Sequence, residues 1–377
     1  MPDVQTRDSR TEPGDEGSGT FTKQLLVEIS HAMERFALAG PDEPRLVIAM
    51  FQRLAYFRRE AEMYRRIAER GATVLVGLVE QFPPDLPPGV RHLLLGDGDE
   101  LAREWSVTVL GPHGGATLVA EDEERVTPGA RTLEAGRRFH GRWSFRRRDA
   151  YAEVLRLRAA TSSRLPVDTL RAIDDVLSAV VTVPEPPGQE WLDAPLRFLV
   201  DRMDLARRGG DSLRGRLDEI ADPAGERDPR TGLLTERFLR RWTAGLGPGT
   251  LPLGLVLLRV DGAAELRHRY GLRAELAAMQ GVAQCFARQL SDVDRVVRMG
   301  HEDFLAVLPA RRPDEVLRFS EEVTRQISTL EQQYPFVPLA GAAAATVTRQ
   351  RPLPLPALAD QVARVSAARA GVSLLVG

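Results

Sequence analysis

Residues 296–309 read VVRMGHEDFLAVLP. Two apolar runs, VV and LAVLP, flank a turn that begins at Gly300 and carries two acidic residues, Glu302 and Asp303. Short apolar runs on both sides of a glycine-led polar turn are typical of two adjacent strands joined by a tight connection. The pattern predicts strand, turn and strand. It leaves open whether the acidic turn is a working nucleotide site, the remnant of one or an ordinary hairpin loop.

The segments before this hairpin alternate between patterns typical of strands and of helices. The motif DPRTGLL (228–234), here called the opening motif, precedes an amphipathic helical pattern in TERFLRRWTAGL. The apolar run LPLGLVLLRVDG predicts a buried strand, and RHRYGLRAELAAMQGVAQCFARQL predicts one long helix. Strands alternating with helices predict an α/β domain.

This order and the spacing of its parts resemble the GGDEF domain of diguanylate cyclases. The resemblance covers residues 226–377 and implies a central, mainly antiparallel sheet. The landmarks that carry it are Asp228, Pro229, Thr231, Gly232, Leu233, Tyr270, Gly271, Arg298, Gly300 and Phe304.

The resemblance implies a reaction that joins two GTP molecules, with Mg²⁺ held mainly by carboxylates. Such hard cations require oxygen ligands, and phosphoryl transfer depends on charge compensation. The family places one carboxylate at the end of the first strand, in a D-x-D-x-F pattern. Here that position is Arg259, followed two residues later by Asp261. A guanidinium has no lone pair for a metal and repels the ion, so the sequence predicts that this metal ligand is lost.

The signature turn departs from the family pattern as well. Where the family has Gly-Gly-Asp/Glu-Glu-Phe, this chain has Gly300, His301, Glu302, Asp303 and Phe304. Glu302 keeps an acid that could contact a metal. His301 replaces the second glycine, and its Cβ and imidazole are expected to obstruct the close approach of backbone to nucleotide.

Four further family positions are altered. The asparagine that reads guanine aligns with Arg267, and its acidic helper aligns with Leu276. The late phosphate-binding lysine has no counterpart, since the only lysine in the chain is Lys23. The R-x-x-D product-feedback site reads Ser291 to Asp294, so the aspartate is expected to stand without its arginine.

These losses together predict a domain without catalysis. No cofactor or metal is expected, and Mg²⁺ would be needed only if catalysis were retained. In place of the metal, we expect Arg259 to form a salt bridge with Glu302 or Asp303, which would stabilise the turn only modestly if exposed.

The N-terminal part reads as a second α/β domain, at residues 21–158. Helical patterns, one of them closed by Gly71, alternate with the apolar runs RLVIAMF, TVLVGLV and HLLLG. WSVTVL and ATLVAE then predict a hairpin. With SHAME at residues 30–34 and the helix that contains Tyr64, this pattern resembles the DICT sensory domain, which implies an input module. The sequence shows no metal-ligand cluster here, and we interpret its later histidines as surface or hydrogen-bonded groups: His92, His113 and His140.

The remaining segments are a polar tail at residues 1–20, expected to be disordered, and a helical linker at 159–225. The linker carries an apolar stripe in alternating steps of four and three residues: Leu192, Leu196, Leu199, Met203, Ala206, Gly210, Leu213, Leu217 and Ile220. A heptad stripe is suited to pairing two copies of the chain. Two ordinary helices packed on the domains would explain it equally well.

Composition limits the class of protein. The net charge of −2 gives no electrostatic argument for nucleic acid or an anionic membrane as partner. No apolar run approaches the roughly 20 residues of a spanning helix, and the N-terminus has no signal core, so a cytoplasmic protein is expected. The single cysteine, Cys285, lies on an apparently amphipathic helix where a buried free thiol is expected.

The sequence thus favours a non-catalytic signalling protein, with a DICT-like input and a degenerate GGDEF domain used for dimerisation or for docking an unidentified protein partner. Two alternatives stay open: a divergent diguanylate cyclase, and a domain that still binds GTP and passes an allosteric signal.

Overall fold

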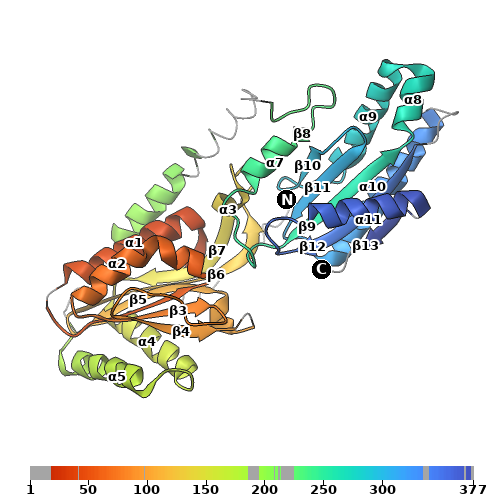
Figure 1. The fold of residues 1–377 in the computed structure, drawn as a ribbon. Helices are drawn as coiled ribbons and strands as arrows, with labels where there is room; N and C mark the ends of the chain where they lie inside the picture. Colours follow the sequence, from red (N-terminus) through yellow and green to blue (C-terminus); the bar gives the residue numbers. More distant parts are fainter. Residues whose placement is uncertain are drawn as a thin grey trace, which may run out of the picture. The chain divides into compact units, whose positions relative to one another are not determined.

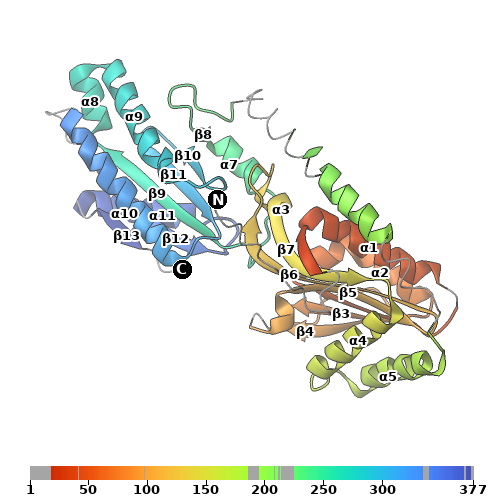
Figure 2. The same cartoon turned by 180° about the vertical axis from the view of Figure 1, so that it is seen from behind.

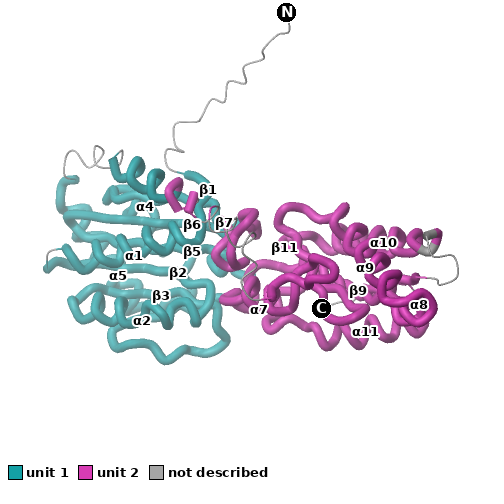
Figure 3. The backbone as a smooth tube through the Cα atoms, turned by 90° about the horizontal axis from the view of Figure 1, so that it is seen from above, with its two compact units in different colours: residues 1–123, 139–204 teal, residues 124–138, 205–377 magenta. Residues whose placement is uncertain are grey.

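The computed structural model describes residues 18–40, 42–96, 98–185, 195–207, 209–210, 213, 225–333, 339–368 and 371–374. The chain divides into two compact units, residues 1–123 with 139–204 and residues 124–138 with 205–377 (Figure 3). Of the tail expected to be disordered, residues 1–17 lie outside the described part. Its last three residues correct the prediction, because they belong to strand β1 (Ser18–Thr22), which lies at the edge of a sheet.

The first unit is built on a mixed sheet with the strand order β1-β7-β6-β5-β2-β3-β4. After β1, its elements are α1 (Lys23–Ala39), β2 (Leu46–Phe51), α2 (Leu54–Glu69), β3 (Thr73–Val79), β4 (Val90–Leu95), β5 (Glu104–Gly111), β6 (Gly114–Val126), β7 (Arg137–Ser144), α4 (Arg147–Thr161) and α5 (Val167–Thr182). The predicted strands and the β5–β6 hairpin are confirmed, with β5 and β6 antiparallel and β2 and β3 parallel.

Helices cover both faces of this sheet, because alternate strand residues point to opposite sides. Val47 and Ala49 of β2 pack on the face covered by α1 and α2, whereas Leu46 and Ile48 pack on the face covered by α4 and α5 (Figures 1 and 2). The second face includes α5 (Val167–Thr182), which the sequence analysis placed in the linker. Its apolar side chains are part of the first unit's core.

The second unit is built on a sheet with the order β13-β12-β9-β11-β10-β8. Its elements are α3 (Leu133–Gly136), β8 (Leu234–Thr235), α7 (Glu236–Trp242), β9 (Leu253–Asp261), α8 (Ala263–Tyr270), α9 (Leu272–Ala287), β10 (Arg295–Arg298), β11 (Asp303–Pro309), α10 (Pro313–Thr329), β12 (Ala340–Thr348), α11 (Leu355–Ala368) and β13 (Val372–Leu374). The β12–β9, β9–β11 and β11–β10 pairs are antiparallel and the outer pairs parallel. The predicted mainly antiparallel sheet is confirmed.

The central strand β9 separates two cores. Val256 and Leu258 face the core formed with α8, α9 and α10, and Leu255 and Leu257 face the core formed with α7 and α11. A strand buried on both faces reads as a continuous apolar run, which is why LPLGLVLLRVDG was recognisable in the sequence.

The second unit also includes a segment from the middle of the chain, residues 124–138. Its short helix α3 places Leu133 in the core beside Leu239 and Trp242. Arg241 donates from Nη1 to the Arg131 carbonyl oxygen at 2.8 Å. The sequence analysis assigned this segment to the DICT-like domain, whereas its core contacts belong to the second unit.

The long helix predicted for residues 267–290 is wrong. Gly271 interrupts it with φ 82° and ψ 177°, a backbone conformation at positive φ that glycine adopts readily because it has no Cβ to clash. The result is two helices, α8 and α9, on the same core.

The helix at residues 195–207 carries part of the heptad stripe. Leu196 packs against the first unit's core, whereas the side chains of Leu199 and Met203 are 58% and 42% exposed. Leu192, Leu217 and Ile220 of the stripe lie outside the described residues. Among the described residues, no helix is both long and apolar enough to cross a bilayer.

Candidate functional site

The candidate site is the turn between β10 and β11 together with the end of β9. Strand pairing places Arg298 opposite Phe304, and the Met299 N–H donates to the Asp303 carbonyl oxygen at 2.9 Å. On the other side of β11, Asp303 lies directly opposite Arg259 of β9. The sheet register therefore brings the altered metal position and the signature turn together.

Arg259 binds Asp303 through two hydrogen bonds. Its Nε donates to Oδ1 at 2.8 Å and its Nη2 donates to Oδ2 at 3.0 Å, a bidentate arrangement. Hydrogen bonding to Asp303 is the main factor that raises the pKa of Arg259, with burial acting in the opposite direction. The expected salt bridge is confirmed, and its acidic partner is Asp303.

Glu302 binds the start of helix α8. Its Oε1 accepts a hydrogen bond from the Ala264 N–H at 3.2 Å, and its carbonyl oxygen accepts from the Val260 N–H at 2.9 Å. Gly262, at φ 96°, turns the chain from β9 into α8 and leaves that N–H available. A carboxylate at a helix N-terminus is stabilised by the unpaired N–H groups there. This acid of the turn thus has a structural partner.

Arg298 connects the turn to the opening motif. It donates to the carbonyl oxygens of Gly300 and His301, at 3.0 and 3.2 Å, and to the carboxylate of Asp228. Asp228 also accepts from the Thr231 hydroxyl at 2.6 Å. Burial pushes the pKa of Asp228 upward, but the bonds from Thr231 and Arg298 outweigh it and hold the pKa below its usual value. These landmarks form one hydrogen-bonded cluster.

Glu275 is a member of the site that the sequence analysis missed. It is 3% exposed, its Oε1 lies 3.1 Å from Nδ1 of His301, and its Oε2 lies 3.7 Å from Nε of Arg267. The acidic helper had been aligned with the neighbouring Leu276, which is half-buried. Glu275 could have been found from the sequence, because it is an acidic residue next to the aligned position, Leu276, and follows Arg267 in the chain.

The remaining site residues also bind side chains of this chain. Asp261 accepts from the Ser366 hydroxyl at 2.7 Å. Asp294 accepts from the Ser291 N–H and hydroxyl at 2.8 and 2.7 Å, and also from Arg311. The arginine position of the feedback pattern is Ser291, as the sequence shows, and a different arginine, Arg311, binds Asp294. Arg311 follows β11 in the chain, so sequence spacing before the turn did not reveal it.

Chemically, this arrangement satisfies its own charges. Asp303 is bound by Arg259, Glu302 by the α8 N-terminus, and Glu275 lies beside His301 and Arg267. A metal ion at this turn would have to displace the Arg259 guanidinium from Asp303, and it would meet a fixed positive charge in doing so.

Comparison with known proteins finds a sensory-domain match in the N-terminal part of the chain. Residues 7–123 match the DICT family model, described as a sensory domain in diguanylate cyclases and two-component systems. The chain is also 25% identical over 136 residues to the diguanylate cyclase DosC of Escherichia coli K12, and equally to that of Shigella boydii. The match covers 35% of this chain, and the chain spans only 30% of the length of these relatives.

Solved structures with GGDEF domains are also similar. The diguanylate cyclase SiaD of Pseudomonas aeruginosa, in complex with its activator SiaC, is 19% identical and covers 61% of this chain and 88% of its own, with a TM-score of 0.37. The GGDEF domain of DgcB from Caulobacter crescentus, in complex with c-di-GMP, is 16% identical and covers 40% of this chain and 96% of its own, with a TM-score of 0.34.

Proposed function

We propose that this signalling protein, which joins a DICT sensory domain to a GGDEF-like domain, synthesises no cyclic di-GMP and acts through protein contacts. In this account the DICT domain receives the input. The GGDEF-like domain, with its metal chemistry lost, serves as a dimerisation or partner-docking module. DosC and SiaD, to which parts of this chain are similar, are named as diguanylate cyclases. In our proposal this chain keeps the fold without the activity.

The bidentate bond between Arg259 and Asp303 carries the proposal. The family resemblance puts a metal-binding carboxylate where Arg259 stands. Replacing it removes a ligand, adds a positive charge and engages the nearby acid of the turn. Mg²⁺ demands near-ideal coordination by oxygen atoms, and positioning of a triphosphate depends on that ion. The single change to Arg259 thus has three effects, and each of them opposes binding of the metal ion that the reaction needs.

The guanine-reading positions support the same conclusion. The resemblance implies an asparagine at Arg267, and in this structure Arg267 and His301 both lie beside the buried Glu275. A base in this place would have to compete with the existing contacts of Glu275 with Arg267 and His301. Since buried carboxylates are costly to leave unpaired, we expect this cluster to be retained.

Coupling between input and output has a covalent basis. The backbone passes from one unit to the other at residues 123–124, 138–139 and 204–205.

Dimerisation is supported by the helix at residues 195–207, where Phe198, Leu199 and Leu205 are more than half exposed. An exposed apolar face of this kind marks an interaction site, and the exposed Leu199 and Met203, which belong to the predicted heptad stripe, favour a second copy of the same helix.

Activity is tested by incubating the purified full chain with GTP and either Mg²⁺ or Mn²⁺ and separating the nucleotides by chromatography. The proposal predicts no cyclic di-GMP above the level of a protein-free sample. Product that increases with protein concentration and is lost in the Glu302→Gln variant would contradict it and support the divergent-cyclase alternative.

A further inference from the structure

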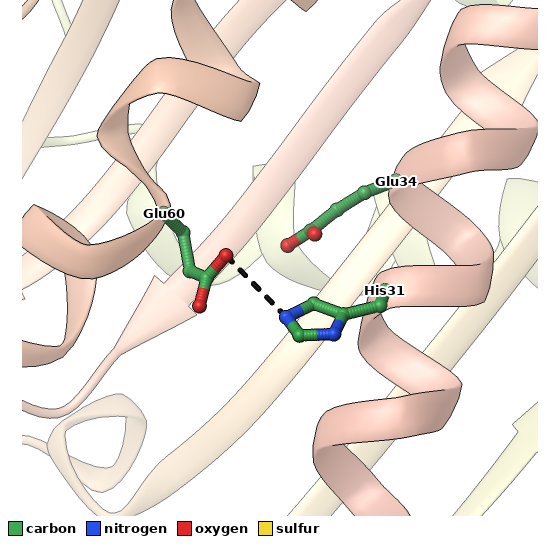
Figure 4. Close-up of side chains that lie close together, drawn as sticks. All are labelled: His31, Glu34 and Glu60. Atoms are coloured by element: carbon green, nitrogen blue, oxygen red, sulfur yellow. Dashed lines mark ion pairs between the residues drawn. The ribbon is translucent and has the colours of Figure 1, made fainter.

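Three side chains of the first unit converge between two helices. His31 and Glu34 come from α1 and Glu60 from α2, and one potential ligand atom from each lies within 4.8 Å of the others. Figure 4 shows the Glu34 carboxylate and the His31 ring side by side, both directed from α1 toward Glu60. Neither the family matches nor the sequence analysis assigns anything to this group.

The local sequence explains why these groups meet. His31 and Glu34 are three residues apart, and residues at that spacing lie on the same helix face. Ile29 and Met33 lie on a different face of α1, which is buried in the core that α1 shares with α2. Glu60 is presented by the neighbouring helix, so the group bridges two separate elements.

Glu34 is the unusual member of the group. It is 0% exposed, and neither carboxylate oxygen has a hydrogen-bond partner of normal geometry. The fully buried hydroxyl of Tyr64 lies beside this carboxylate but forms no hydrogen bond of normal geometry with it. A buried carboxylate without partners is costly. An unpartnered buried acid directed into a group of potential ligands indicates that a ligand completes the site.

We propose that His31, Glu34 and Glu60 bind a divalent first-row transition-metal ion of the Zn²⁺ or Mn²⁺ class. Imidazole together with carboxylate oxygens suits this class. An all-oxygen set would favour Mg²⁺ or Ca²⁺, and thiolates would favour Cu(I).

The separation of His31 and Glu60 fits this assignment. Two ligands at about 2.1 Å from a tetrahedral metal are roughly 3.4 Å apart, and Nε2 of His31 lies 3.4 Å from Oε2 of Glu60. The side chains of His31 and Glu60 are 35% and 30% exposed, so an ion can enter from solvent. Three protein ligands leave a coordination position for water or a small molecule.

The ion would link α1 to α2 across the core that both helices cover. Metal that binds only the folded state stabilises it by mass action, so occupancy would rigidify the sensory unit. This gives the DICT domain a chemically defined input, either the ion itself or a ligand bound to it. The inference is independent of whether the GGDEF-like domain is catalytic.

Binding is tested by calorimetry and elemental analysis of the chelator-treated full chain with Zn²⁺, Mn²⁺ or Fe²⁺, with Mg²⁺ and Ca²⁺ for comparison. We expect one transition-metal ion per chain and weak or no binding of the other two. His31→Asn, Glu34→Gln and Glu60→Gln should each weaken binding by at least about tenfold, the lower end of what even supporting partners of metal ligands contribute.

Two matched variants serve as controls. Glu62→Gln alters an exposed glutamate of α2, the helix that carries Glu60. His113→Asn alters a histidine that contacts Glu43 elsewhere in the first unit. Both should bind the metal as the unaltered chain does. Because His31 and Glu60 are partly exposed, their variants carry the test even where Glu34→Gln fails to fold. The proposal is overturned if none of the three transition metals binds, or if His31→Asn and Glu60→Gln bind as tightly as the unaltered chain.

Discussion

Reversing the charge of Arg259 tests the role assigned to its bond with Asp303. In Arg259→Asp, two carboxylates face each other at directly paired positions of neighbouring antiparallel strands. Like charges at such positions are destabilising, and opposite charges are stabilising. The variant therefore exchanges attraction for repulsion at the centre of the candidate site, and it also re-creates an acid at the family's metal position.

The size of the effect follows from the geometry and exposure of the pair. The side chains are 32% and 29% exposed, so solvent screens the interaction. Exposed pairs contribute about 0.2–1 kcal/mol, and the bidentate geometry places this one near the upper end. Losing it costs about 1 kcal/mol, and repulsion of similar size brings the total for Arg259→Asp to roughly 2 kcal/mol. Arg259→Gln loses only the attraction.

Hydrogen exchange measured by mass spectrometry reports this change in local stability, peptide by peptide, in the full chain. Peptides covering β9 and β11 should exchange roughly 30-fold faster in Arg259→Asp and about 5-fold faster in Arg259→Gln, since 1.4 kcal/mol corresponds to a factor of ten. Mg²⁺ should partly restore protection in Arg259→Asp alone, because only that variant has the added oxygen ligand. Arg325→Asp, which reverses an exposed charge on α10, should leave these peptides unchanged.

Unchanged or slower exchange in Arg259→Asp would show that the pair contributes nothing to the stability of the turn. Protection of the unaltered chain by Mg²⁺ in these same peptides would contradict the proposed loss of metal binding.

Three other predictions follow from buried or exposed groups. Asp228→Asn should lower the free energy of unfolding by about 1–2 kcal/mol at neutral pH, because it weakens the bonds from Thr231 and Arg298. The pKa of Asp228 is depressed in the folded state, so its contribution to stability is present above the unfolded pKa and is lost as the pH falls through the folded pKa. The unfolding free energies of variant and parent, measured by urea titration, should therefore converge in acid, and a difference that stays constant with pH would argue against this. Cys285 is buried, burial raises its thiol pKa, and Ellman's reagent should label it slowly in the folded chain and rapidly in urea; fast native labelling would contradict the fold here. Leu199→Glu combined with Met203→Glu should shift the mass measured by light scattering from dimer toward monomer, and an unchanged dimer would place the interface elsewhere.

Much of the fold could be predicted from local patterns. The buried strands read as apolar runs, and the order of strands and helices around GHEDF matched one family. The helix break at Gly271 was missed because a single glycine inside a helical pattern is often tolerated. The Asp303 partner of Arg259 was predictable as one of two acids, because charge reversal at a former ligand position leaves an unpaired acid nearby.

Side-chain contacts outside the family motifs were not predictable. Arg311 binds Asp294 from beyond β11, and Ser366 binds Asp261 from a helix near the C-terminus. The His31, Glu34 and Glu60 group was missed for the same reason. The spacing of the first two was visible in SHAME, but Glu60 joins them only because α2 packs beside α1.

We propose that the Arg259 guanidinium occupies the place where a divalent ion would hold a triphosphate. Isothermal calorimetry of the full chain with GTP and saturating Mg²⁺ tests it most directly, with Arg259→Asp measured in parallel. The account predicts no saturable heat for the unaltered chain. Saturable Mg²⁺-dependent GTP binding by the unaltered chain that is lost in Asp303→Ala would contradict it.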